Sequence, residues 1–143
     1  MNDVFKTIIY DMQTVTMNVK QCLQSQLLKL ELDITFEMVR VLTILSYLKY
    51  ANQQQLADLT LKNKASLTSL IDNLVKRDLV TRSEDTADRR NKIITITSKG
   101  KEYMKKVNPL VETFFDNLSK EFNSEEIALL KKSILKMNEF IKR

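Results

Sequence analysis

The first 30 residues carry apolar side chains at intervals of three or four, which is the period of one face of an α-helix. No Gly or Pro interrupts this stripe, whose members are Val4, Ile8, Met12, Val15, Val19, Leu23, Leu27 and Leu30. The spacing predicts a helix of about seven turns. Because so long a stripe needs an apolar surface to cover it, we expect this helix to pack against a partner.

A second helix, predicted over 35–49, is apolar on most sides and is therefore expected at the centre of the fold. A short third helix begins after Asn52, which can cap it while Gln55 returns the bond. The side chains expected to face inward from this helix are Leu56, Ala57 and Leu59. Asn63 is a good cap for a fourth helix that reaches about Arg77. Its apolar stripe consists of Leu67, Leu70, Ile71 and Leu74. Two short helices joined by a brief turn, the second polar on its outer face, are typical of a helix-turn-helix.

The pattern then changes to two short β-like runs, Leu79–Ser83 and Ile93–Thr97, which flank a charged loop over Asp85–Lys92. This pattern predicts a β-hairpin directly after the helix-turn-helix. A charged hairpin in that position is the outline of a wing, so the sequence indicates a winged helix-turn-helix and makes nucleic acid the leading candidate partner.

Two further helices are predicted after the hairpin. Ser98 is expected to cap the first, over Lys99–Leu118, and Pro109 should kink or divide it. Asn123 and Glu126 form a second cap pair that starts a last helix ending near Ile141. The apolar stripe of the last helix has coiled-coil-like spacing. Long amphipathic helices at both ends of the chain predict a homodimer assembled from the termini.

The expected fold is therefore mainly α with a small β-hairpin wing. Only one Gly and one Pro occur in 143 residues, which favours helices over tight turns. We expect a single domain over 1–143, with a winged-helix DNA-binding core at 35–98 and dimerisation helices at 1–34 and 99–143. No run is apolar enough to span a membrane, and the N-terminus does not resemble a secretory signal, so we expect a cytoplasmic protein.

Composition leaves little catalytic chemistry. The chain has no His, a single Cys and a single Gly, which removes the commonest general base, a zinc cage and a glycine-rich phosphate loop. Catalysis by carboxylates or Lys stays open, but no motif points to it. We therefore expect a binding protein that is not an enzyme and uses no metal and no cofactor.

Basic residues gather in the predicted winged segment. Residues 60–106 hold twelve Lys or Arg against six Asp or Glu, whereas the remainder holds eleven against twelve. A local basic excess is what phosphate binding requires. A solvated charged surface would have the same composition, so charge alone leaves both interpretations open.

The segment Leu56–Gly100 resembles the core of the MarR family of bacterial transcriptional regulators. The most specific pieces are LTSLIDNLVKRDLV at 67–80, the triplet Asp-Arg-Arg at 88–90, and an alternating strand that ends at Ile96-Thr97 before Lys99-Gly100. The resemblance implies a homodimeric repressor of a pseudo-palindromic operator in double-stranded DNA, released by a small phenolic or other anionic effector or by an oxidant. It also implies that the fourth helix enters a major groove and that the wing reaches a minor groove.

The resemblance assigns the wing residues. Arg89 and Arg90 stand at the family's basic positions, with Arg90 as the minor-groove contact. Asp88 is expected to brace the wing, by pairing with an Arg or by capping the turn. Asn91 and Lys92 are weaker candidates for phosphate contacts. The alternative is a flexible, solvated loop.

The DNA-binding candidates on the fourth helix are Lys64, Ser66, Thr68, Ser69 and Asn73. A helix face that merely meets water is the alternative. Relatives often carry Arg or Lys at positions 69 and 73, so this chain should depend more on hydrogen bonds and on the wing. Relatives usually carry Gly at position 78, and Asp78 can adopt the same left-handed conformation at some cost.

The family's effector pockets lie between the dimer helices and the winged module. Residues that could contribute to such a pocket here are Met12, Phe36, Val39, Arg40 and Tyr47. Arg40 could meet an anionic ligand, or it could pair with Glu37 on its own helix.

Two alternatives to the DNA-binding repressor stay open. A winged-helix protein–protein interaction module would use the same fold but has no need of paired Arg beside a polar helix face. A redox-sensing regulator would use Cys22, yet the sensing Cys of the peroxide-responsive branch lies about two turns earlier. Cys22 neighbours Leu23 on the apolar stripe and is interpreted as a small buried packing residue.

Overall fold

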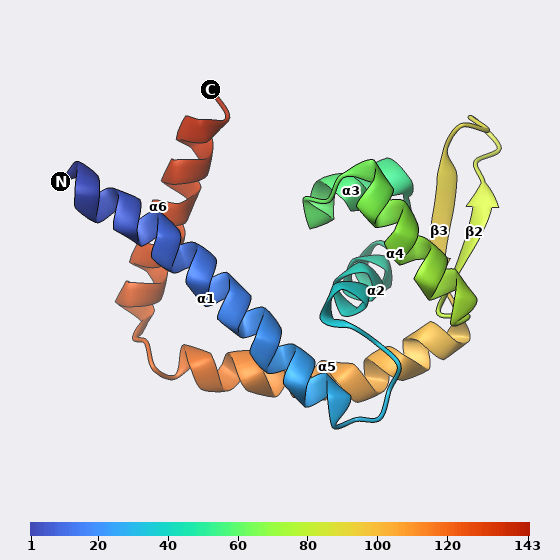
Figure 1. Cartoon of the computed structure of the whole chain (residues 1–143), viewed down its shortest axis with the longest axis horizontal. Helices are drawn as coiled ribbons and strands as arrows, with labels where there is room; N and C mark the ends of the chain where they lie inside the picture. The colour runs from blue at the N-terminus through green and yellow to red at the C-terminus, as the bar shows by residue number, and fades with distance from the viewer. The chain divides into compact units, whose positions relative to one another are not determined.

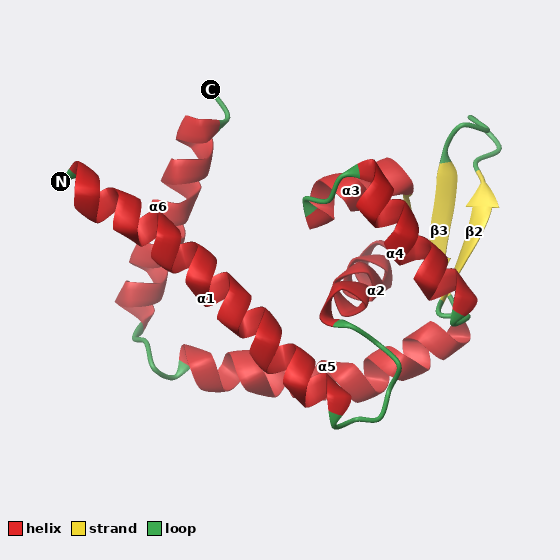
Figure 2. Cartoon of the chain, viewed as in Figure 1, coloured by secondary structure: helices red, strands yellow, loops and turns green.

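The computed structural model describes residues 1–143, which form two compact units, Met1–Pro109 and Leu110–Arg143. Six helices and three short strands follow one another along the chain (Figures 1 and 2). In order they are α1 (Asn2–Leu28), α2 (Phe36–Leu48), β1 (Tyr50–Asn52), α3 (Gln53–Thr60), α4 (Lys64–Lys76), β2 (Val80–Glu84), β3 (Lys92–Ile96), α5 (Ser98–Ser119) and α6 (Ser124–Ile141). The predicted fold class, mainly helical with a small antiparallel wing, is confirmed. None of the helices combines the length and apolarity needed to cross a bilayer.

Helix α2 lies at the centre of the first unit, as its apolar pattern predicts. It buries Met38, Val39, Val41, Leu42 and Leu45. The predicted stripe of α4 is also confirmed, because the buried residues of α4 are Leu67, Leu70, Ile71 and Leu74. The prediction for Leu59 is wrong, since 49% of this residue is exposed. Thr60 completes the inward face of α3 in its place, four residues after Leu56, and its hydroxyl donates to the Leu56 carbonyl at 2.6 Å.

Side-chain caps set the starts of the helices. Asn52 and Gln55 exchange hydrogen bonds of 2.8 and 2.9 Å at the start of α3, and Asn123 forms the same capping box at the start of α6. Asn63 accepts from the Ser66 amide at 2.8 Å and begins α4. These caps confirm the predicted ones, because each depends only on residues three apart in the sequence.

Helix α5 differs from its prediction in two respects. Thr97 caps it and not Ser98, because the Thr97 hydroxyl accepts from the Gly100 amide at 3.0 Å, so the helix begins one residue earlier. Of the two effects predicted for Pro109, division is wrong, because α5 runs through this residue. A proline removes only one backbone hydrogen bond, and the turns on either side hold the helix together.

The three strands form an antiparallel sheet in the order β1-β3-β2. The hairpin strands lie within one residue of their predicted ends, with Val80 opposite Ile96 and Glu84 opposite Lys92. Strand β1 was not predicted, because three residues are too few to show alternation. Ala51 of β1 pairs with Ile94 of β3, which connects the sheet to the start of α3.

Most of the apolar stripe of α1 has no cover within the first unit. Only Leu23 and Leu27 of this helix are buried, whereas Val4, Ile8 and Val15 are exposed. In the second unit no residue of α6 is buried. Each terminal helix therefore presents apolar surface that its own unit leaves open.

Candidate nucleic-acid interface

The base of the hairpin is fixed against the end of α4. Asp78 follows this helix with φ 57°, the left-handed conformation expected from the sequence, and the Leu79 amide donates to the Leu74 carbonyl at 3.0 Å. The Thr97 hydroxyl donates to the Asp78 carbonyl at 2.6 Å. The wing therefore leaves α4 in one defined direction and runs alongside it (Figure 1).

Two cations of the hairpin form ion pairs with carboxylates. Arg82 on β2 contacts Asp72 in the middle of α4, with 2.6 Å between Nη2 and Oδ1. Lys92 on β3 contacts Glu84 across the hairpin at 3.0 Å. The first pair connects the wing to α4. The second partly neutralises Lys92, which weakens its case as a phosphate contact.

The tip of the wing is held by hydrogen bonds from aspartate side chains. The Asp88 carboxylate accepts from the Arg90 amide at 3.0 Å, and Asp85 accepts from the Ala87 amide at 2.9 Å. Asp88 thus caps the turn, which is one of the two bracing roles considered from the sequence. Arg89 and Arg90 are both exposed, and neither guanidinium has a carboxylate within ion-pair distance.

The predicted contact residues of α4 differ in how free their polar atoms are. Lys64, Ser66 and Ser69 are exposed. Thr68 is half-buried, donates to the Lys64 carbonyl at 2.8 Å and accepts from a Gln53 amide at 3.3 Å. Asn73 is turned along its own helix. Its amide nitrogen donates to the Ser69 carbonyl at 3.0 Å, and its oxygen accepts from Arg77 at 3.3 Å. The side chains of Lys64, Ser66 and Ser69 are therefore the most accessible of the five predicted residues.

A cavity of about 150 Å³ lies where the first turns of α3 and α4 meet the wing. Its lining residues are Gln53, Gln54, Ala57, Lys64, Leu67, Arg90, Asn91 and Lys92. Three of them are cations and none is acidic. Lys92 is paired with Glu84, so Lys64 and Arg90 are the cations that suit the cavity to an anion such as a phosphate. Lys64, Arg90, Asn91 and Lys92 were predicted from the sequence. Gln53 and Gln54 were missed, although the polar run at 52–55 could have indicated an exposed helix start.

The five residues predicted for an effector pocket have different surroundings. Val39 is buried in the core, Met12 and Phe36 are half-buried, and Tyr47 is 87% exposed. The Arg40 guanidinium donates to the Leu59 carbonyl at 3.4 Å and is not paired with Glu37.

The interpretation of Cys22 as a buried packing residue is wrong, because Cys22 is exposed. It precedes the buried Leu23 by one residue, and one residue turns a helix by about 100°. The thiol therefore falls outside the buried face, where the Gln26 amide lies 3.5 Å from its sulfur. No group of three or more His, Cys, Asp or Glu is arranged to hold a metal ion.

Comparison with known proteins finds one family model that matches part of the chain. Residues 34–92 match the model of the MarR family. The chain is 33% identical over 79 residues to the uncharacterized HTH-type transcriptional regulator YsmB of Bacillus subtilis, a match that covers 55% of this chain and 54% of that protein. The chain thus spans about half the length of the curated relatives it matches.

Solved structures share the fold over nearly the whole chain. AbsC, a MarR family transcriptional regulator from Streptomyces coelicolor, superposes with a TM-score of 0.85 at 23% identity, covering 99% of this chain and 97% of AbsC. A mutant of MarR from E. coli complexed with operator DNA gives a TM-score of 0.82 at 22% identity, covering 92% of this chain and 93% of that one.

Proposed function

We propose that the chain is a transcriptional regulator of the MarR family and that it binds double-stranded DNA. The observation that carries the proposal is the convergence of Lys64 on α4 with Arg90 on the wing at one cavity that has no acidic lining residue. A solved relative of the same fold is complexed with operator DNA. The second candidate partner, a protein bound through the wing, has no such support from the charges.

The two parts of the interface suit different grooves. The outer face of α4 offers the small polar side chains Ser66 and Ser69, which can approach base edges in a major groove. Arg89 and Arg90 project from a turn that Asp88 holds, and arginine suits the negative potential of a narrow minor groove. With only Lys64 and Lys76 as cations on α4 itself, the wing supplies a large part of the positive charge.

We propose that the DNA-binding form is a homodimer assembled from the terminal segments 1–34 and 99–143. The exposed apolar faces of α1 and α6 support this assembly, because each needs a cover that its own unit does not provide. A two-fold dimer reads a pseudo-palindromic operator, since each copy presents the same α4 to one half-site.

The further proposal is that the dimer acts in the cytoplasm as a repressor, and that a small phenolic or other anionic effector relieves repression. Met12, Phe36, Val39, Arg40 and Tyr47 remain the candidates for effector contact. This proposal rests on the family resemblance alone.

The decisive variant is Arg90→Ala, measured by fluorescence anisotropy on a duplex that the wild-type protein selects from a random-sequence pool. Loss of one phosphate-neutralising cation should lower the affinity and reduce the slope of log affinity against log salt by about 1. Arg143→Ala, which removes an arginine outside the wing, is the matched control and should bind as the wild type does. Equal affinity and slope for Arg90→Ala and the wild type would refute the assignment of the wing.

A further inference from the structure

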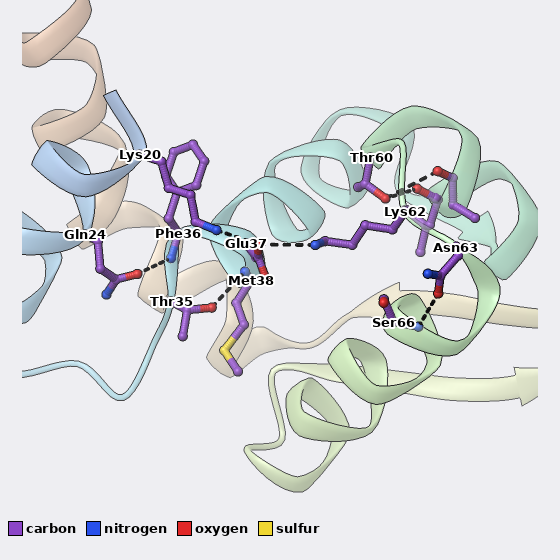
Figure 3. A network of polar contacts seen from close by, with 12 residues as sticks. Lys20, Gln24, Thr35, Phe36, Glu37, Met38, Thr60, Lys62, Asn63 and Ser66 are labelled. Atoms are coloured by element: carbon purple, nitrogen blue, oxygen red, sulfur yellow. Dashed lines mark hydrogen bonds and ion pairs between the residues drawn. The ribbon is translucent and has the colours of Figure 1, made fainter. Parts of the chain in front are cut away.

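A single carboxylate joins α1 to the turn before α4. Glu37, in the first turn of α2, places Oε1 2.7 Å from Lys20 Nζ and 3.2 Å from Lys62 Nζ (Figure 3). Only 24% of the Lys62 side chain and 37% of the Glu37 side chain are exposed. The three groups therefore form a network that is partly shielded from solvent, where ion pairs are screened less than at an open surface.

The two lysines belong to parts of the chain with different roles. Lys20 lies on α1, whose exposed apolar stripe forms part of the proposed dimer contact. Lys62 directly precedes Asn63, the residue that caps α4 through the Ser66 amide. Glu37 therefore connects α1, which carries part of the proposed dimer contact, with the residue that precedes the cap of α4.

A second contact holds the same turn of α2 against α1. The Gln24 side-chain oxygen accepts from the Phe36 amide at 2.8 Å, one helical turn after Lys20 (Figure 3). The Thr35 hydroxyl caps α2 by accepting from the Met38 amide at 3.2 Å. Lys20 and Gln24 of α1 thus both contact the first turn of α2. A shift of α1 along its axis would therefore displace Glu37 as well.

The electrostatics favour the charged form of the Glu37 carboxylate. The hydrogen bond from Lys20 is the main reason why the pKa of Glu37 lies below its ordinary value of 4.5, with Lys62 adding to the effect and burial opposing it. One carboxylate offsets two ammonium groups. Removing the carboxylate charge would leave two cations facing the same neutral group, so the contact would turn from attractive to repulsive.

We propose that Glu37 is a positioning residue that fixes the start of α4 relative to α1 and so makes operator recognition depend on where α1 lies. This inference rests on the proposed function. A change in the position of α1 would then reach the outer face of α4 through the Glu37 carboxylate and the turn at Lys62.

The test compares Glu37→Gln with the wild type on the selected duplex and on a scrambled duplex of the same composition. We expect affinity for the selected duplex to fall about three- to tenfold, in the range of a small ion-pair network, and affinity for the scrambled duplex to be unchanged. Glu102→Gln is the matched control, because it removes a carboxylate from the exposed Lys105 pair with the same change in net charge. It should bind both duplexes as the wild type does.

A double-variant comparison separates positioning from a general loss of stability. Lys20→Met alone should weaken selected-duplex binding although Lys20 is outside α4 and the wing. Lys20→Met in the Glu37→Gln background should restore part of the affinity, because it relieves the repulsion between Lys20 and Lys62. If Glu37→Gln fails to fold by circular dichroism, Lys20→Met carries the test by itself.

The outcomes are distinct. Wild-type discrimination between the two duplexes, combined with unaffected binding by Glu37→Gln and Lys20→Met, would overturn the inference and leave the proposed function intact. Equal losses on both duplexes would overturn it as well, because misplacement of α4 should affect only sequence reading. A wild-type protein that fails to discriminate at all would overturn the proposed function, and the inference with it.

Discussion

Replacing Gly100 by Ala should destabilise the protein, although helix propensity predicts the opposite. Gly100 lies in the first turn of α5 and has no left-handed backbone. An added Cβ would overlap the Leu79 carbonyl oxygen and lie 2.7 Å from Ile96 Cγ1. The oxygen belongs to the backbone at the base of the wing and already accepts from the Thr97 amide at 3.1 Å. It therefore cannot move aside without disturbing the hairpin.

Whether Gly100→Ala raises or lowers the free energy of unfolding depends on helix propensity and on the steric cost of the added carbon. Ala is favoured over Gly inside a helix by about 1 kcal/mol. Forcing an extra carbon into a packed site costs about 1–3 kcal/mol, and a backbone obstacle places this substitution toward the upper end. The free energy of unfolding should therefore fall by about 1–2 kcal/mol.

Urea unfolding followed by circular dichroism at one protein concentration measures this change. With a slope of about 2 kcal/mol per molar urea, the midpoint should fall by roughly 0.5–1 M. Lys101→Ala, at the next and exposed position of α5, is the control and should change the free energy of unfolding by less than about 0.5 kcal/mol. A midpoint for Gly100→Ala at or above that of the wild type would refute the steric argument.

Two further predictions concern the start of α4 and acid stability. Asn63→Ala should lower the free energy of unfolding by about 1 kcal/mol, because the Ser66 amide loses its hydrogen-bond acceptor. Asn63→Asp keeps an acceptor oxygen and should retain most of the stability. Equal losses for the two variants in urea unfolding would contradict the role of Asn63 as a cap. The pKa of Glu37 is lowered in the folded chain, so its contribution to stability is complete above pH ~4.5 and disappears as the pH falls through the lowered pKa. The difference in free energy of unfolding between wild type and Glu37→Gln should therefore shrink from about pH 6 to about pH 3, and a difference that grows on acidification would contradict the network.

The sequence predicted most of the fold because its signals are local. The caps at Asn52, Asn63 and Asn123 depend on residues three apart, and the buried stripe of α4 depends on a helical period. The missed features depend on contacts distant in sequence. Strand β1 exists because Ala51 meets Ile94, and no local pattern in three residues indicates that pairing.

In the candidate interface, too, features with a local signal could be predicted and features that depend on distant contacts could not. The position of Arg90 at the wing tip could be predicted from the charged loop between two strands. The pairing of Arg82 with Asp72 could not, because it depends on how the hairpin lies along α4. The exposure of Cys22 likewise depends on which part of α1 meets the core, and the apolar stripe alone did not resolve it.

Selection of duplexes from a random-sequence pool by the wild-type protein tests most directly whether the chain reads DNA as a symmetric pair. The predicted result is enrichment of an inverted repeat whose half-site centres lie about one helical turn, roughly 10.5 base pairs, or a multiple of it apart. Arg90→Ala should enrich that repeat weakly or not at all. Recovery of a pool with no common sequence, or of a single element without a symmetric counterpart, would contradict sequence reading by a homodimer through α4 and the wing.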